Sequence, residues 1–374
     1  MNKKYVFKIG VIAASLLVIT NMSYAGEFKR FSVSAGWLHV MPQGKANPFN
    51  INTAVKKGTV STVGAISEGA FVNSIDPNAT NIDYGTGASF NTKETLQGYV
   101  EADAFRQLGI SDADRNVLAS ESGSAVVNGL DSWQSGGTGL EADDVDTLGL
   151  TFNYYLNDNV SLQLIGGIPP KVDIKGKGEI YAPLSGHATP TGTSGDILFP
   201  DGLDLKQDVA ITNLGNKPKA ASVRAWTPAL EAQYQFGKSG VNKFRPYIGA
   251  GLMYAYFNDI KLNGQIESDL IAAGHMIQNV LDNKAGAALD GKVSSGVMRV
   301  DVDADDAIAP IVTAGFTYDL NENWYGVASV SYAKLSNKAT INVVNQTTGA
   351  ELIHATTKID IDPLITYFGV GYRF

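Results

Sequence analysis

The stretch that decides the fold is the last one, Leu364 to Phe374, which reads LITYFGVGYRF. Every second residue from Leu364 onward belongs to a mostly apolar face that ends on aromatic side chains. The residues between them are mostly small or polar, and Arg373 is among them. A period of two with one apolar face indicates a β-strand. We therefore expect a final strand whose Phe374 face lies against an apolar surrounding.

The same alternation recurs upstream and predicts seven more strands. They are expected from Phe31 to Met41, Leu148 to Leu156, Val160 to Ile168, Leu230 to Phe236, Phe244 to Tyr256, Ile308 to Leu320, and from Trp324 onward. A strand that closes the chain on an aromatic residue resembles the C-terminal signal of bacterial outer-membrane proteins. Eight is an even number, as single-chain bacterial barrels require. The expected fold is all-β, an eight-stranded antiparallel transmembrane β-barrel.

The links between these strands alternate in length. Those at residues 157–159, 237–242 and 321–323 are short, and those at 43–144, 178–222 and 260–304 are long. In outer-membrane barrels short turns face the periplasm and long loops face outward. We expect three long extracellular loops, both termini in the periplasm, and short helices near 94–108 and 266–281. Whether the second helix caps the barrel or only packs under the loops stays open.

The beginning of the chain has the layout of a secretory signal. Basic residues lie between Lys3 and Lys8, an apolar run covers 9–19, and small residues stand at Ser23 and Ala25. Such a segment is removed from the mature protein. We expect residues 1–25 to be a signal peptide and residues 26–374 to form the barrel, in the outer membrane of a Gram-negative bacterium.

Composition excludes several classes of function. The formal net charge of −8 argues against a nucleic-acid partner, which favours a basic patch. The chain has no cysteine, and its four histidines, His39, His187, His275 and His354, show no metal-ligand spacing. No phosphate-binding loop or nucleophile elbow is present. We expect no enzyme activity, no catalytic residue, no metal and no cofactor.

Several stretches carry a family resemblance. They are DTLGLTFNYYLNDNV from Asp146, KFRPYIGAG from Lys243, LNENW from Leu320, IDP from Ile361 and GVGYRF from Gly369. In this order and spacing they resemble the outer membrane protein W (OmpW) family, which includes the alkane-uptake protein AlkL. The resemblance covers the strands but not the loops. It implies a narrow hydrophobic channel that passes small hydrophobic molecules sideways into the membrane, and for some members a role as bacteriocin receptor.

Two features depart from the family. The first loop is far longer than usual. A channel-lining tryptophan of the family is replaced here by Ser331, which we take as a possible gate position.

The period of two also assigns the inward-facing side chains. We expect them to form an apolar upper lumen, lined by Leu38, Val40, Tyr247, Met253, Phe257, Ala333 and Leu335. A barrel of eight strands is barely wide enough for its own side chains, which argues against an open water channel. Below the lumen we expect Glu231, Arg245 and Arg373 to form a plug of ion pairs and hydrogen bonds, because buried charges must be paired. The alternative for these charges is solvation at the turns.

Pro169 and Pro170 interrupt the third expected strand. Proline donates no ladder hydrogen bond, so pairing must break or bulge there. We take this as a candidate lateral opening, and the alternative is a bulge at the rim without a role in transport.

Two functions follow from these expectations. One is a channel for passive uptake of small hydrophobic molecules, which leave laterally into the membrane. The other is a structural barrel that displays a large surface loop for adhesion or as a bacteriocin or phage receptor. Expected partners are outer-membrane lipid, lipopolysaccharide and small hydrophobic ligands, and the expected state is a monomer.

Overall fold

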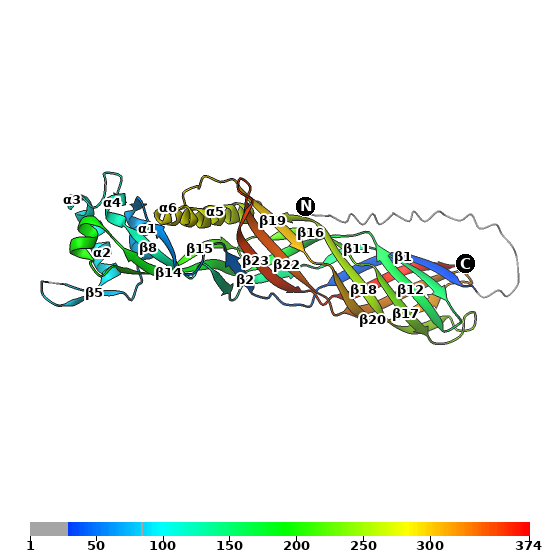
Figure 1. Cartoon of the computed structure of the whole chain (residues 1–374). Coiled ribbons are helices and arrows are strands. Elements are labelled where there is room, and N and C mark those ends of the chain that lie inside the picture. Colours follow the sequence, from blue (N-terminus) through cyan, green and yellow to red (C-terminus); the bar gives the residue numbers. More distant parts are fainter. Residues whose placement is uncertain (1–28, 84) are drawn as a thin grey trace.

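The computed structural model describes residues 29–83 and 85–374, and these form an elongated molecule with a barrel at one end (Figure 1). The expected signal peptide, residues 1–25, lies outside the described residues. Within the part of the chain that the structure describes, no helix is both long and apolar enough to cross a membrane.

Eight strands close into an antiparallel barrel, as the alternation predicted. They are β1 (Phe31–Met41), β11 (Val145–Tyr155), β12 (Val160–Gly167), β17 (Ala229–Gln235), β18 (Phe244–Leu262), β20 (Ala307–Asp319), β21 (Trp324–Ala333) and β24 (Leu364–Arg373). The ring runs β1-β24-β21-β20-β18-β17-β12-β11 and returns to β1. Every pairing around it is antiparallel.

The barrel has an apolar outside and a partly polar inside. On β24, Phe368 and Val370 are 54% and 50% exposed, whereas Tyr367 and Arg373 on the other face are 5% and 4% exposed. A surface that is apolar outward matches lipid, and closure of the ring leaves no unpaired edge inside the bilayer.

Aromatic side chains gather at both ends of this apolar surface. At the end with short turns, ring pairs join Phe31 with Phe374, Phe244 with Phe316, Tyr234 with Phe236, and Trp324 with Tyr372. At the opposite end, which we call the rim, the exposed aromatic residues are Trp37, Trp226, Tyr254, Tyr256 and Tyr332. Such belts mark the two membrane interfaces. The C-terminus lies at the turn end (Figure 1).

The short connections are built from asparagine. Asn157 Oδ1 accepts hydrogen bonds from the backbone amides of Asn159 and Val160, each at 2.9 Å. Asn321 Oδ1 likewise accepts from Asn323 and Trp324 at 2.9 and 2.8 Å. These contacts stabilise tight turns, because the side-chain oxygen replaces a backbone acceptor.

Beyond the rim, the connections fold into an extension, comprising residues 42–83, 85–144, 168–228, 256–306 and 334–363 (Figure 1). The part of the extension next to the barrel, which we call the proximal part, continues the barrel wall beyond the rim. Its strands are β18, β16 (Ala221–Trp226), β13 (Lys171–Lys177) and β10 (Gly139–Ala142), which pair in that order. A second sheet runs β19 (Met298–Ala304), β22 (Ser336–Asn345), β23 (Ala350–Asp360), β2 (Phe49–Thr53) and β9 (Ser132–Ser135). The final hairpin, formed by β22 and β23, thus continues well beyond the rim.

The distal part has its own core. It contains a sheet that runs β15 (Leu203–Asn213), β14 (Glu179–Thr189), β8 (Ser124–Asn128) and β3 (Thr59–Thr62). Two separate pairs of short strands are β4 (Ile66–Ser67) with β7 (Asn116–Val117), and β5 (Thr80–Ile82) with β6 (Ser89–Asn91). The helices here are α1 (Glu68–Ser74), α2 (Thr92–Glu101), α3 (Ala104–Gln107), α4 (Ala119–Ser122) and a π-helical turn, Ser194–Leu198. The helix expected near 94–108 is therefore two helices, α2 and α3, and Asp103 between them has φ 57°.

The longest helix, α5 (Gly264–Leu281), confirms the helix expected near 266–281, and α6 (Ala285–Leu289) follows it. Asn263 caps α5, and its side chain accepts from the amide of Gln265. Ile266, Leu270 and Ile277 recur on one face and are buried in the core of the proximal part. Since that face packs on the core, α5 covers the extension rather than the barrel itself.

Candidate functional site

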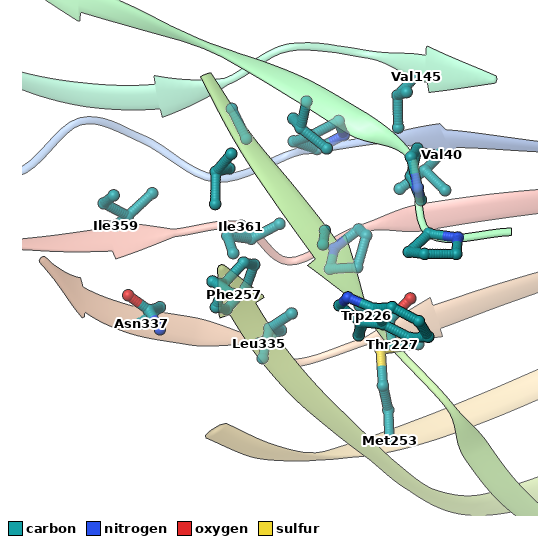
Figure 2. A pocket seen from close by; sticks show the side chains of 18 of the residues that line it. Val40, Val145, Trp226, Thr227, Met253, Phe257, Leu335, Asn337, Ile359 and Ile361 are labelled. Carbon is teal, nitrogen blue, oxygen red and sulfur yellow. The ribbon is translucent and has the colours of Figure 1, made fainter. Parts of the chain in front are cut away.

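An apolar cavity of about 370 Å³ extends from the upper barrel into the proximal part of the extension. Figure 2 shows its wall, in which Val40 of β1, Met253 and Phe257 of β18, and Ile359 of β23 are labelled. We call this cavity the lumen. Its size falls within the range of sites that bind small molecules.

Six of the seven residues expected to line a channel do line the lumen: Leu38, Val40, Tyr247, Met253, Phe257 and Leu335. The seventh, Ala333, is fully buried beside Met253 and Leu335 in the same apolar cluster and does not reach the cavity surface. Ser331 lines the lumen and contacts Thr313 Oγ1 through its hydroxyl at 2.7 Å. It therefore contributes a small polar patch to the lumen.

Below the lumen, Glu231 is fully buried. Its carboxylate accepts a hydrogen bond from Thr313 Oγ1 at 2.6 Å and one from Gln233 Nε2 at 3.4 Å. Gln233 in turn donates to Gln163 Oε1 at 2.6 Å. Within the described residues Glu231 forms no ion pair, so the expectation that it would pair with an arginine is not met. The carboxylate is satisfied by neutral donors instead.

The two arginines lie closer to the turn end and have partners of their own. Arg373 donates from Nη1 to Asp319 Oδ1 at 2.6 Å, and its guanidinium lies 4.4 Å from the ring centre of Tyr325. Arg245 donates to backbone carbonyls at the turns, including those of Phe236 and Gly237 at 3.4 Å. Both arginines are buried, so neither is a solvated turn charge.

Three tyrosines complete the polar floor. Tyr247, Tyr325 and Tyr367 form a buried cluster with Val327. Each ring lies against a glycine, Gly315, Gly371 or Gly369 respectively, where a Cβ would overlap it or approach within 2.8 Å. The hydroxyls of Tyr367 and Tyr325 contact Ser34 and Ser32 of β1 at 2.8 and 3.0 Å. Side chains thus fill the lower barrel, as its diameter requires.

The wall of the lumen is interrupted at Pro169 and Pro170, both of which line the cavity. On one side, the pairing of β12 with β11 ends at the hydrogen bond from the Ile168 amide to the Leu148 carbonyl. The next backbone hydrogen bond on this side joins the Asp143 amide to the Asp173 carbonyl. On the other side, pairs join Ile165 with Ala229 and Lys171 with Arg224, and residues 166–169 have no ladder pair with 226–228. We call this region the proline seam. Trp226 of the rim borders it (Figure 2).

Two ion pairs lie near the rim. Lys175 Nζ donates to Asp143 Oδ1 at 2.7 Å, and this hydrogen bond lowers the pKa of the Asp143 carboxyl below its usual value. Lys334 contacts Asp362 in the same way, which raises the pKa of the lysine. Asp143 and Lys334 therefore keep their charge at neutral pH, and the two ion pairs mark the water-facing side of the rim.

A large share of the lumen wall comes from segments in which no strand was expected. These residues include Phe49, Leu140, Val172, Ile174, Ala221, Val223, Leu262, Ile341 and Ile359. A signal was present, because KVDIKGK from Lys171 and ASVRAW from Ala221 alternate between apolar and polar residues. The strands were missed because they are short and pair with distant segments.

Nothing in the described residues suggests chemistry at this site. In the ranges 29–83 and 85–374, no group of three or more His, Asp or Glu side chains could hold a metal ion. The lumen offers apolar contact surface with a few hydroxyl and amide groups at its base. Such a surface can bind a hydrophobic molecule without reacting with it.

A closed antiparallel barrel with an apolar belt, two aromatic girdles and an apolar lumen defines the class of protein: an outer-membrane β-barrel of the Gram-negative type. Residues 287–374 match the model of the OmpW family. The resemblance to the OmpW family is thereby confirmed.

Curated proteins of similar sequence carry the same family name. The chain is 27% identical to outer membrane protein W of Vibrio cholerae over 229 residues, which are 61% of this chain and 73% of that protein. Outer membrane protein W of Escherichia coli is 26% identical over 257 residues, 67% of this chain and 85% of the relative. The crystal structure of OprG from Pseudomonas aeruginosa aligns with 17% identity and a TM-score of 0.46, covering 92% of this chain and 96% of that one.

Proposed function

We propose that this protein is a channel for passive uptake of small hydrophobic molecules, which leave the lumen sideways into the outer membrane. The observation that carries the proposal is the lumen itself, an apolar cavity with a side-chain floor and an interrupted wall. Moving a hydrophobic molecule from water into such a cavity is favourable by roughly 25 cal/mol per Å² of apolar surface buried. The OmpW resemblance implies the same function.

The closed floor determines the direction of travel. Glu231, Arg373 and the three tyrosines fill the lower barrel with hydrogen-bonded side chains. A hydrophobic ligand would have to displace these contacts to continue toward the turn end, and unpaired buried polar groups are costly. The proline seam offers an exit at the level of the rim girdle, where the acyl chains begin.

Filling the lumen tests the proposal. Ala339→Phe places a large side chain in the cavity wall, because Ala339 lines the lumen and is 6% exposed. We expect uptake of a neutral fluorescent hydrophobe, N-phenyl-1-naphthylamine, by intact cells to fall to the level of cells without the protein. Ala232→Phe is the matched control, because Ala232 is exposed on the outer face of β17. Equal uptake by the two folded variants would reject a transport role for the lumen.

The lateral exit has its own test. Pro169→Val with Pro170→Val restores two amide donors in the seam, so that the ladder beside β11 and β17 can close. We expect the lumen still to bind the probe, as measured on purified protein, while uptake into the membrane slows. Unchanged uptake by a correctly folded double variant would mean that the seam is only a bulge at the rim.

A second function, display of a surface structure for adhesion or as a bacteriocin or phage receptor, is supported by the distal part. That part has its own core, including Ile66, Phe105 and Leu203, and lies farthest from the barrel (Figure 1). Residues 64–122 can be removed there, because the Val63 amide already bonds to the Gly123 carbonyl at 2.9 Å. Removing 190–201 with them trims the facing hairpin of β14 and β15.

The trimmed variant separates the two functions. Loss of cell-surface binding with uptake intact would favour display, and loss of uptake would favour the channel. Orientation is tested with the same cells: a tag inserted at Thr348, in the exposed turn between β22 and β23, is expected to be reached by antibody from outside. Labelling only after the outer membrane is opened would reverse the proposed orientation, in which both termini face the periplasm.

A further inference from the structure

Strand β18 crosses from the barrel into the extension without a break, and its two edges differ. One edge pairs with β17 and then with β16 over most of its length. The other edge pairs with β20 only as far as Ala255, whose partner is Ala307. Beyond Ala255, the described residues show no ladder partner on that edge. The neighbouring strand, β19, is itself the edge strand of its sheet and pairs with β22.

A second cavity of about 490 Å³ fills this gap between β18 and β19. We call it the side notch. Its ten lining residues are those from Tyr256 to Ile260 and from Val302 to Asp306. Half of them also line the lumen: Phe257, Ile260, Val302, Asp303 and Ala304. The notch and the lumen are therefore separated by little more than one layer of side chains.

A bulge in β18 turns two apolar side chains into this layer. The pairing with β16 passes from Arg224–Asn258 to Ser222–Lys261 across an irregularity, and Asp259 has a φ of 51°. An extra residue in one strand reverses the alternation beyond it. Phe257 and Ile260 consequently both line the lumen. In a regular strand, two side chains three positions apart would point to opposite faces. Phe257 is half-buried and lies between the two cavities.

The outer side of the notch faces water. Tyr254 and Tyr256 of the rim girdle mark its lower border, and the Tyr254 hydroxyl donates to Asp306 Oδ2 at 2.6 Å. Asp305 and Asp306 are exposed, as is Asp259, which lies 3.5 Å from Lys261 Nζ. Carboxylates at this position are solvated, so the notch lies above the acyl chains.

Neither end of the lumen offers a comparable route. Toward the turn end lies the polar floor. Toward the distal part, Ile266, Leu270 and Ile277 of α5 are packed in the core, and Ile266 itself forms part of the lumen wall. The β-ladder in the lumen wall is thus interrupted at the side notch, which faces water, and at the proline seam, which faces the membrane.

We propose that the side notch between β18 and β19 is the entrance of the lumen, and that Phe257 is the side chain a hydrophobic molecule must pass. The ligand class is a small neutral hydrophobe taken from the aqueous side above the rim. This inference rests on the proposed channel function and adds its entry route. The molecule enters past Phe257, occupies the lumen and leaves at the proline seam.

The absence of cysteine from the sequence allows a direct test. Val302→Cys puts a single thiol on the wall shared by notch and lumen, and Thr348→Cys is the matched control in a remote exposed turn. Intact cells are treated with a bulky, charged, membrane-impermeant thiosulfonate, and uptake of N-phenyl-1-naphthylamine is measured before and after treatment. Each cell sample is its own control for folding.

We expect both thiols to react. Uptake through the Val302→Cys protein should fall by about tenfold or more after reaction, because a charged adduct in an apolar passage raises the barrier. Uptake through the Thr348→Cys protein should not change. Phe257→Ala should raise the uptake rate, since it widens the passage without adding a new group.

A Val302→Cys thiol that stays unreactive, or one that reacts without slowing uptake, would overturn the entrance while leaving the channel in place. If cells that carry the unmodified protein took up no more probe than cells without it, the channel would be rejected, and the entrance would be rejected with it.

Discussion

Arg373 and Asp319 form a buried ion pair inside the barrel, with Arg373 Nη1 2.6 Å from Asp319 Oδ1 and the two side chains only 5% and 13% exposed. The pair joins β24 to β20 across the intervening strand β21. Removing one member leaves the other charge buried without a partner, which typically costs about 3–5 kcal/mol.

We therefore expect Asp319→Ala to lower the free energy of unfolding by about that amount, roughly 3–5 kcal/mol, in urea titrations of the barrel in lipid vesicles. Asp301→Ala is the control, because Asp301 and its partner Arg299 are 46% and 53% exposed. Exposed pairs contribute about 0–1 kcal/mol. Equal effects of the two substitutions would show that the Arg373–Asp319 pair does not stabilise the floor.

Glu231 behaves differently, because its carboxylate is held by Thr313 and Gln233 without a cation among the described residues. Glu231→Gln keeps an acceptor oxygen and removes the charge. We expect the free energy of unfolding to stay the same or to rise. Thr313→Val, which removes the donor, should lower it by about 1–3 kcal/mol. A large loss in Glu231→Gln alone would indicate that the charge has a partner at this site.

Gly371 provides the space in which the ring of Tyr325 lies, and a Cβ there would overlap the ring. Gly371→Ala should push Tyr325 away from Ser32 and cost about 1–3 kcal/mol, as overpacking does. Gly326, next to Tyr325 in the sequence, has no atom within 4 Å of its added Cβ. Gly326→Ala is therefore expected to change stability by less than about 0.5 kcal/mol. Thermal unfolding of the two variants gives the comparison, and equal midpoints would exclude tight packing at Gly371.

A pH dependence is expected where α5 meets the loop that follows α6. His275 Nδ1 accepts a hydrogen bond from the Ser294 amide at 3.2 Å, and burial lowers the pKa of this histidine below 6.5. A lowered pKa in the folded state stabilises the fold above pH 6.5, and this contribution is lost as the pH falls through the folded-state pKa.

Hydrogen exchange of residues 264–281, corrected for intrinsic rates, should accordingly speed up as the pH falls below 6.5. His275→Phe should remove this dependence while keeping a ring in place. A wild-type profile that is flat through this range, or one that His275→Phe leaves unaltered, would contradict the role of His275.

Much of the barrel was predictable from local pattern. Alternation places Phe368 outward and Tyr367 inward without any knowledge of neighbours, because the period of a strand is fixed by its backbone. The eight expected strands match those observed to within a few residues, apart from β18, which runs six residues past its expected end at Tyr256 to Leu262. Its extension was hidden because the bulge at Asp259 reverses the alternation there.

The partners of the buried charges were not predictable in the same way. Period two shows that Glu231, Arg245 and Arg373 face inward, but their heights depend on how each strand is shifted against the next. With the observed registers, Arg373 lies near Asp319, and Glu231 lies beside Thr313. The opposite signs of these charges suggested ion pairs that include Glu231, but the strand registers place other partners beside it.

The extension escaped prediction because its contacts are remote in sequence. Strand β2 pairs Asn50 with Thr356 on β23, and a window of neighbouring residues contains no sign of such a partner. A strand of four or five residues buries an apolar face only when it pairs with such a distant strand. Composition alone made residues 43–144 look like a loop.

The core of the proximal extension carries a consequence for assembly. Its residues come from four separate connections: Phe49 from the first, Val223 from the second, Ile277 from the third and Ile359 from the fourth. In the orientation proposed above, this core cannot be completed until the last hairpin of the chain has crossed the membrane. Long-range contacts of this kind form late and slowly. The earlier segments therefore lack part of their core until the C-terminal hairpin arrives. Barrel closure and completion of the lumen wall thus take place together in biogenesis.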